Sequence, residues 1–260
     1  MTLPAVFLSH GAPTLAVEDG SDTQAWAELA SQLPRPDSIL VVSAHWDTDA
    51  PAASTSEQPE TIHDFFGFPR ELYEQRYPAP GAPALARRTA ALLSAAGMRC
   101  EMNPKRGLDH GAWVPLKWMY PRADIPVTQL SVQSHRGPRH HHAIGRALAA
   151  LRDEGTLVLA SGGIVHNLRD LEWHMRGTRQ ASDWARTFND WIAARVKSGA
   201  VDELIDYRRL APQAERCHPT EEHFDPFFVA LGAGGPAARR LELGFDLGSL
   251  GMDGYVFGDK

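Results

Sequence analysis

Two short segments, 38–44 (SILVVSA) and 156–161 (TLVLAS), constrain the fold most, because each is almost continuously apolar. Such runs are typical of strands covered on both faces, as in parallel sheets. Segments 5–9 and 126–132 are two further predicted strands. The alternation with helical segments predicts an α/β fold, a single domain with a largely parallel or mixed central sheet flanked by helices. The predicted helices are bounded by Gly, Pro, Ser or Asp and cover 22–32, 82–96, 140–152, 181–197 and 221–231, and we expect one catalytic domain over 1–260.

Three of the four predicted strands lead into a histidine. His10 follows the first strand, His45 follows segment 38–44, and His166 comes shortly after segment 156–161. Ligands of open α/β sheets bind at the carboxyl ends of the strands. One histidine at such a place is about as often structural as functional, but three with the same placement favour a common site. We therefore expect an active site at the C-terminal ends of the strands.

Two further histidines have local contexts that suggest chemistry. His110 lies in a loop just before a helical turn, where Asp and Gly neighbours can hold an exposed ring. His223 is predicted in the first turn of helix 221–231, with Thr220 as its N-cap. The positive end of the helix dipole disfavours imidazolium and so keeps the ring neutral, as metal ligation requires. His218, before Pro219, is predicted to be a surface or loop residue.

The chain has 12 histidines, and the others carry weaker signals. His63 lies in an aromatic, glycine-containing segment that either covers a pocket or packs on the surface. The run 140–142 is predicted to be a solvated helix start, and His135 follows a predicted strand. His174 is predicted to be structural.

Composition and charge exclude several classes of protein. Lys and Arg number 26 against 32 Asp and Glu, a formal charge of −6, which argues against a nucleic-acid or anionic-membrane surface. No apolar stretch approaches the length of a membrane span, and the N-terminus lacks a signal-peptide pattern. Two distant cysteines suggest a reducing compartment, so a cytoplasmic location is expected by default.

Several common catalytic motifs are absent. The sequence has no G-x-G-x-x-G opening a helix, no P-loop and no G-x-S-x-G elbow. Neither cysteine has a context that would make it a nucleophile. A single metal ion bound by histidines is the chemistry that remains.

An ordered set of short motifs spans nearly the whole chain: LSHG (8–11), VSAHW (42–46), TIHDF (61–65), LDHG (108–111), SGGIVHNL (161–168) and PTEEH (219–223). In this order the chain resembles the class III (LigB-type) extradiol ring-cleavage dioxygenases, and within them the 4,5-DOPA dioxygenase branch. The resemblance implies a single-domain α/β fold and one non-haem metal ion.

The resemblance also assigns roles to residues. It implies that His10, His45 and His223 are the metal ligands, that His166 is the catalytic acid and base, and that His110 touches substrate or oxygen. Glu221 and Glu222 compete for the third ligand position, because some relatives use two His and one Glu. A three-histidine site suits Zn(II) as well as the Fe(II) expected for dioxygenase activity.

The expected reaction inserts both atoms of O₂ into a catechol beside its hydroxyl pair. A histidine near its ordinary pKa can first accept and later return a proton. Arg106 or Arg136 is a candidate partner for a substrate carboxylate. Two alternatives are a zinc-dependent hydrolase and a non-catalytic scaffold protein on the same fold. Neither the identity of the catechol nor the oligomeric state follows from the sequence.

Overall fold

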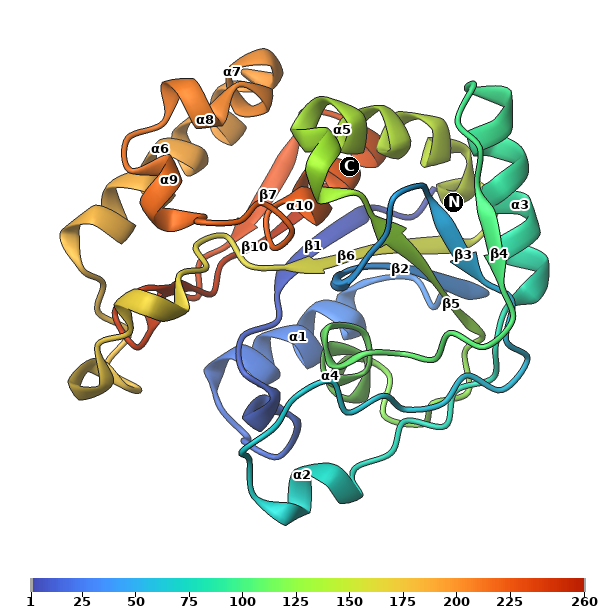
Figure 1. The fold of residues 1–260 in the computed structure, drawn as a ribbon, viewed down its shortest axis with the longest axis horizontal. Coiled ribbons are helices and arrows are strands. Elements are labelled where there is room, and N and C mark those ends of the chain that lie inside the picture. Colours follow the sequence, from blue (N-terminus) through green and yellow to red (C-terminus); the bar gives the residue numbers. More distant parts are fainter. Residues whose placement is uncertain (1, 260) are drawn as a thin grey trace.

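A computed structural model describes residues 2–259 and places eight strands in one central sheet (Figure 1). The strand order is β4-β3-β5-β2-β6-β1-β10-β7. The four consecutive strands β5, β2, β6 and β1 are parallel to one another. β10 and β7 continue the sheet in antiparallel pairing, so the sheet is mixed. The strands are β1 (Ala5–Ser9), β2 (Ser38–Asp47), β3 (Ala52–Ser54), β4 (Glu101–Asn103), β5 (Val127–Val132), β6 (Thr156–Gly162), β7 (Ala238–Leu241) and β10 (Gly254–Phe257), with β8 (Phe245–Asp246) and β9 (Leu250–Gly251) as a separate pair.

Helices cover both faces of the sheet, with α1 and α4 on one side and α3, α5 and α10 on the other (Figure 1). α6 packs beside α10 at the β1–β10 end. No helix among residues 2–259 is long and apolar enough to cross a membrane. The helices are α1 (Ser21–Gln32), α2 (Arg70–Glu74), α3 (Pro83–Ala95), α4 (His110–Met119), α5 (Gly137–Leu148), α6 (Asp183–Ser198), α7 (Val201–Ile205), α8 (Tyr207–Leu210), α9 (Ala214–Cys217) and α10 (Asp225–Gly234).

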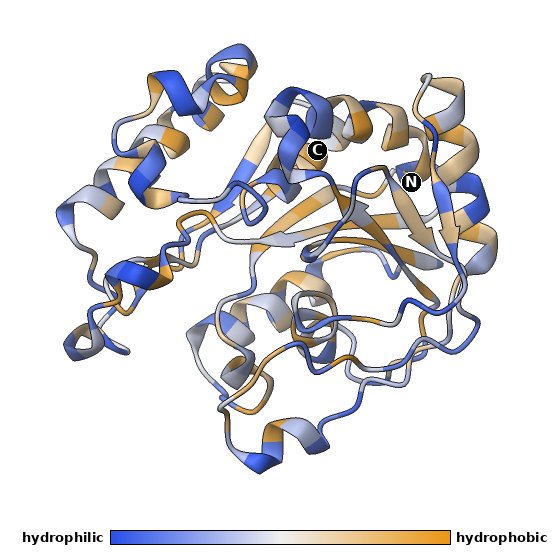
Figure 2. Cartoon of the chain, viewed as in Figure 1, coloured by the Kyte–Doolittle hydropathy of each residue, from blue (hydrophilic) through white to orange (hydrophobic). Residues whose placement is uncertain are grey.

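The central strands are apolar on both faces because both faces are buried. In β1, Val6 and Leu8 pack towards α1 and α4, while Ala5 and Phe7 pack towards α10. Figure 2 shows the apolar residues along these strands and on the helix sides that face them. The α/β fold predicted from the uninterrupted apolar runs is therefore confirmed.

One predicted helix begins in the wrong place. The chain turns through the segment 218–224, and α10 starts at Asp225 rather than at residue 221. Thr220 caps no helix, because its hydroxyl donates to Glu222 at 2.9 Å. Pro226 fits the first turn of α10, where its missing N–H leaves no intrahelical bond unmade. His223 thus lies in the turn that precedes the helix.

Candidate metal centre and active site

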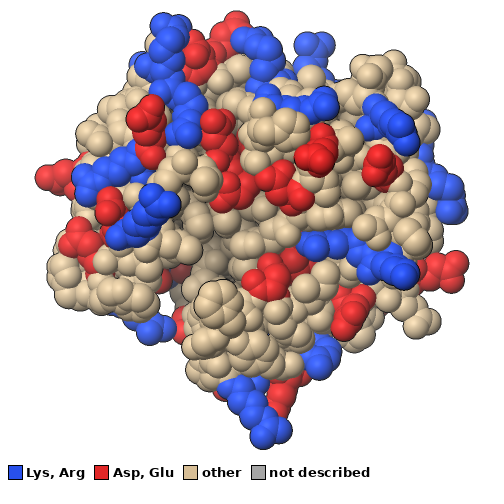
Figure 3. All heavy atoms as spheres, in the orientation of Figure 1, with Lys and Arg blue, Asp and Glu red and all other residues tan. Residues whose placement is uncertain are grey.

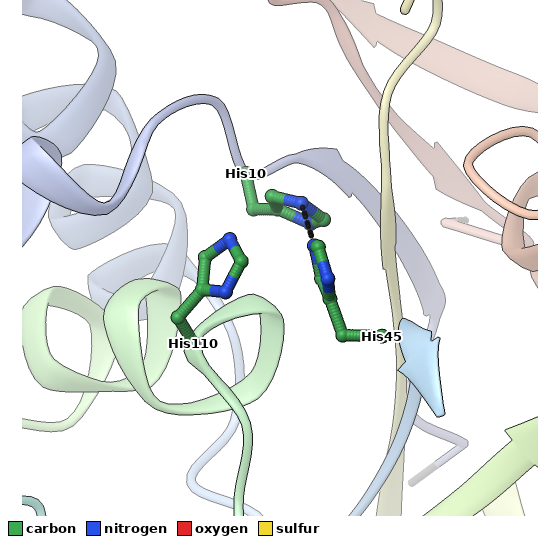
Figure 4. A group of neighbouring side chains, drawn as sticks. All are labelled: His10, His45 and His110. Carbon is green, nitrogen blue, oxygen red and sulfur yellow. Dashed lines mark hydrogen bonds between the residues drawn. The ribbon is translucent and has the colours of Figure 1, made fainter. Parts of the chain in front are cut away.

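The carboxyl ends of three adjacent parallel strands bring three histidines together. His10 follows β1 directly, His45 lies near the end of β2, and His166 follows β6 after a short glycine-containing loop. The rings of His10 and His45 have centroids 4.9 Å apart, and their Nε2 atoms are 3.0 Å apart (Figure 4). The convergence expected from the strand ends is present.

His110 reaches the same point from the other side. It is the first residue of α4, and Asp109 caps this helix by accepting a hydrogen bond from the backbone N–H of Ala112 at 3.1 Å. The ring of His110 lies 4.0 Å from that of His45 and 5.3 Å from that of His10, measured between centroids. Figure 4 shows these three rings facing a common space.

His223 and His166 complete the cluster as a stacked pair. Their ring centroids are 3.5 Å apart and their planes differ by 6°. The His223 ring also lies 4.9 Å from His45 and 5.5 Å from His10. The side-chain nitrogens of His10, His45 and His110 can all lie within 4.8 Å of one another, and so can the donor atoms of His166, Glu222 and His223. Five histidines from distant segments therefore form one group of potential ligands.

The Nδ1 atoms of His10 and His223 each lie at hydrogen-bond distance from a side-chain oxygen. Nδ1 of His10 lies 2.9 Å from Oγ of Ser161, whose own proton goes to the carbonyl of Gly111. Nδ1 of His223 lies 3.0 Å from a carboxylate oxygen of Glu222. Such partners fix the tautomer with the proton on Nδ1 and leave Nε2 free to bind a metal. Neither Ser161 nor Glu222 was assigned this role from sequence.

Burial keeps four rings of the cluster, those of His10, His45, His166 and His223, uncharged. Desolvation lowers the pKa of His10, His166 and His223 well below the ordinary value, and the neighbouring histidines lower it further. Burial, followed by the nearby His110, lowers the pKa of His45 to about 4. The rings are therefore neutral near pH 7, which is the protonation state that metal ligation requires.

A buried hydrogen-bond network around Asp109 and Arg106 lies next to the histidine cluster. Asp109 is fully buried and accepts a hydrogen bond from Ser43 Oγ at 2.7 Å, while Arg106 and Gln129 contact its other oxygen. Arg106 also donates to the backbone carbonyl of His45 at 3.2 Å. Its guanidinium is therefore engaged within the fold, and neither Arg106 nor Arg136 lines the cavity. The prediction that one of them meets a substrate carboxylate is not supported.

The five histidines open into a cavity of about 690 Å³. Figure 3 shows a hollow near the centre of this face, walled mainly by uncharged side chains. Arg176, in an ion pair with Glu18 at 3.2 Å, is the one Lys or Arg among the lining residues. The apolar wall consists of Val17, Phe65, Phe66, Phe68, Leu72, Val165, Leu168, Leu171, Trp173, Leu247, Leu250 and Met252.

The remaining histidines lie outside this cavity. Nε2 of His63 lies 3.1 Å from the carbonyl of Gln75, and its ring packs edge-on against Phe65, so it supports the wall rather than lining it. His174 has a side chain that is 73% exposed.

Two expectations about the exposure of these outer histidines were wrong. His218 lies in a loop but is fully buried rather than on the surface, with its ring stacked on Phe224 and its Nε2 3.0 Å from the carbonyl of Ile164. His141, inside the run predicted to be solvated, is also fully buried and lies 3.0 Å from a carboxylate oxygen of Asp225. Both side chains point into the protein interior, one from a helix and the other from a loop, and the polar residues beside them in the sequence do not indicate this burial.

Comparisons with known proteins agree with this geometry. Residues 4–257 match the family model described as the catalytic LigB subunit of aromatic ring-opening dioxygenase. The chain is 42% identical over 262 residues to "4,5-DOPA dioxygenase extradiol" of Beta vulgaris, covering 96% of this chain and 95% of the relative. It is 43% identical over 256 residues to the protein of the same name from Escherichia coli (strain K12), covering 96% and 93%. The crystal structure of an uncharacterised protein from Escherichia coli K12 superposes with a TM-score of 0.81 at 37% identity, covering 98% of this chain and all of that one.

Proposed function

The chain belongs to the family of the catalytic LigB subunit of aromatic ring-opening dioxygenases and is an extradiol ring-cleaving enzyme, and we propose that its substrate is a DOPA-like catechol. Relatives named 4,5-DOPA dioxygenase extradiol match over almost their full length, which supports this substrate class. We take residues 1–260 as one catalytic domain. No observation favours the hydrolase or the scaffold alternative.

We propose that His10, His45 and His223 hold one metal ion. Imidazole Nε2 atoms bound to a tetrahedral metal at about 2.1 Å place neighbouring ring centroids about 5 Å apart. The three pairs among these histidines measure 4.9, 5.5 and 4.9 Å between centroids. The spacing of 4.0 Å between His45 and His110 is too short for two ligands of this kind. The Nε2 atoms of His10 and His45 lie 3.0 Å apart, close enough to bind one cation together.

The glutamates near the third position have other partners. Glu221 pairs with Arg208 at 3.1 Å, and Glu222 lies against Nδ1 of His223. This arrangement supports His223 as the ligand and Glu222 as the group that orients it. Fe(II) is the proposed physiological metal, with Zn(II) as a competitor for three neutral imidazoles. When bound, Fe(II) supplies open coordination positions at which the catechol oxygens and O₂ meet.

We assign the proton transfers to His166. Its ring is partly buried and stacks on that of His223, it lines the cavity, and desolvation lowers its pKa, so it enters the reaction as a neutral base. It accepts a proton from a catechol hydroxyl and later returns it as the ring opens. His110 presents its Nε2 to the same cavity and orients the substrate or oxygen. Phe65 and Phe68 supply apolar surface that excludes water around the aromatic ring.

Arg176 is the proposed partner of a side-chain carboxylate on the substrate. It is half-exposed and lines the same cavity as the histidines, where it can meet a charged group on the substrate side chain. Glu18, its ion-pair partner, is placed to receive an amino group. This pairing of opposite charges suits an amino-acid side chain such as that of DOPA.

The observation that carries the proposal is the convergence of five histidines on one largely apolar cavity in a chain of this family. The test is anaerobic reconstitution with Fe(II) or Zn(II), followed by addition of oxygen with DOPA, dopamine, 3,4-dihydroxyphenylacetate and 4-methylcatechol. Fe(II) protein should produce a yellow ring-opened product fastest with DOPA, and Zn(II) protein should produce none. Equal rates on all four catechols would contradict the substrate assignment.

A further inference from the structure

One carboxylate, that of Asp64, contacts two histidines of the cluster. Its Oδ2 lies at hydrogen-bond distance from Nδ1 of His110, 2.9 Å, and in longer electrostatic contact with Nδ1 of His45, at 3.4 Å. Its Oδ1 accepts a hydrogen bond from the backbone N–H of His110 at 2.9 Å. Asp64 belongs to the loop between β3 and α2, and its side chain is 22% exposed.

The contact to the backbone fixes the position of the ring as well as its orientation. His110 begins α4, and the first N–H groups of a helix have no partner within it. Asp109 takes the N–H of Ala112, and Asp64 takes that of His110. The loop carboxylate thus ties the start of α4 to the site from outside the helix.

The chemistry of a carboxylate decides which ring nitrogen carries the proton. An ionised carboxylate only accepts hydrogen bonds, so a neutral imidazole facing it carries its proton on Nδ1. Nε2 then keeps its lone pair. For His45 this is the tautomer that metal ligation requires, and for His110 it makes Nε2 an acceptor that faces the cavity.

We propose that Asp64 is a positioning residue that sets His45 and His110 together in the Nδ1–H tautomer, and so couples metal binding to the orientation of the substrate. The proposal rests on the function proposed above, because it takes His45 as a ligand and His110 as a group that meets the substrate. Since both rings share one oxygen atom, a single substitution should alter both of them at once.

The variant that tests this proposal most directly is Asp64→Asn, because it keeps the size and shape of the side chain and replaces one acceptor oxygen by a donor. The amide oxygen of the asparagine should accept the backbone N–H of His110, because in the opposite orientation the amide NH₂ would face that N–H as a second donor. The NH₂ group then faces the two rings as a donor and favours the Nε2–H tautomer of His45 and His110. Zn(II) affinity, measured by calorimetry without substrate, should fall about 10- to 100-fold. ¹⁵N spectra of the metal-free protein should show the ring protons moving from Nδ1 to Nε2.

Two further variants separate the effect of hydrogen bonding from that of packing and from unrelated effects of removing a charge. Asp64→Glu retains an acceptor and should bind Zn(II) more tightly than Asp64→Asn. Asp124→Asn, at an exposed ion pair with Arg35 away from the cavity, should match the wild type in both measurements. If Asp64→Asn does not fold, the wild-type ¹⁵N spectrum alone decides, because it must show Nδ1–H on both rings.

The proposal is overturned if either wild-type ring carries its proton on Nε2. Equal affinities of the Asn and Glu variants would also overturn it, because packing rather than hydrogen bonding would then be responsible. Neither readout needs turnover. A wild-type enzyme that fails to open catechols, while its Asp64 variants change metal affinity as described, would contradict the proposed function and leave this proposal standing.

Discussion

The position of His223 depends on a close backbone approach that Gly162 makes possible. A Cβ atom at residue 162 would lie 2.1 Å from the carbonyl oxygen of His223, whereas ordinary contacts begin at 3.4 Å. The backbone around His223 must therefore retreat by about 1 Å or more in a Gly162→Ala variant. Metal–ligand distances tolerate only about 0.2 Å, so this displacement should remove His223 from the coordination sphere.

The expected result has two parts. Zn(II) affinity measured by calorimetry should fall at least about 10-fold, and crowding of a packed region should destabilise the metal-free protein by about 1–3 kcal/mol. That loss corresponds to a drop of several degrees in the thermal midpoint, at roughly 2–4 °C per kcal/mol for a chain somewhat smaller than this one.

The adjacent glycine provides a matched control. A Cβ at residue 163 would meet its nearest neighbour, Cβ of His166, at an ordinary 3.4 Å. The backbone N–H of residue 163, which donates to the His223 carbonyl at 2.8 Å, is kept by alanine. Gly163→Ala should therefore bind Zn(II) like the wild type. Wild-type affinity in Gly162→Ala would refute the placement of His223 as a ligand.

His166→Ala should retain the metal but lower kcat by about 10²–10⁴-fold, measured by product absorbance, and unchanged turnover would remove His166 from its role. Arg176→Ala should raise KM about tenfold for DOPA but not for 4-methylcatechol, and an equal rise for both would contradict the carboxylate contact. Burial lowers the pKa of His218 to about 3, so the unfolded chain binds this proton more readily and the free energy of unfolding should decrease as pH falls from about 6.5 towards 3. Denaturant titrations should show a weaker decrease in His218→Gln, and an identical pH dependence would contradict the buried neutral ring.

The sequence predicted the centre of the fold well because that centre is encoded locally. Each of β1, β2 and β6 contains a run of apolar residues buried on both faces, so its residues alone identify it, whereas β5 mixes apolar with buried polar residues. The strands at the antiparallel edge, β7 and β10, were not predicted. β7 carries two arginines, and β10 begins at a glycine, so neither has the pattern of a buried strand.

The site was predicted where residues follow strand ends and missed where it depends on tertiary partners. His10, His45 and His166 could be grouped because parallel strands end at one edge of the sheet. Asp64 could not be linked to His45 and His110, because its loop reaches them only after the chain has folded. The motif 61–65 offered no direct signal, because the histidine next to Asp64 in the sequence, His63, lies outside the cavity.

The most direct test of ring cleavage at this histidine site is the stoichiometry of oxygen consumption by the Fe(II)-loaded enzyme with DOPA. We expect one O₂ consumed for each catechol opened, a yellow product and no H₂O₂, with His10→Ala, His45→Ala and His223→Ala each losing both metal and turnover. Oxygen uptake that yields H₂O₂ and a quinone, or turnover without oxygen uptake, would contradict this expectation.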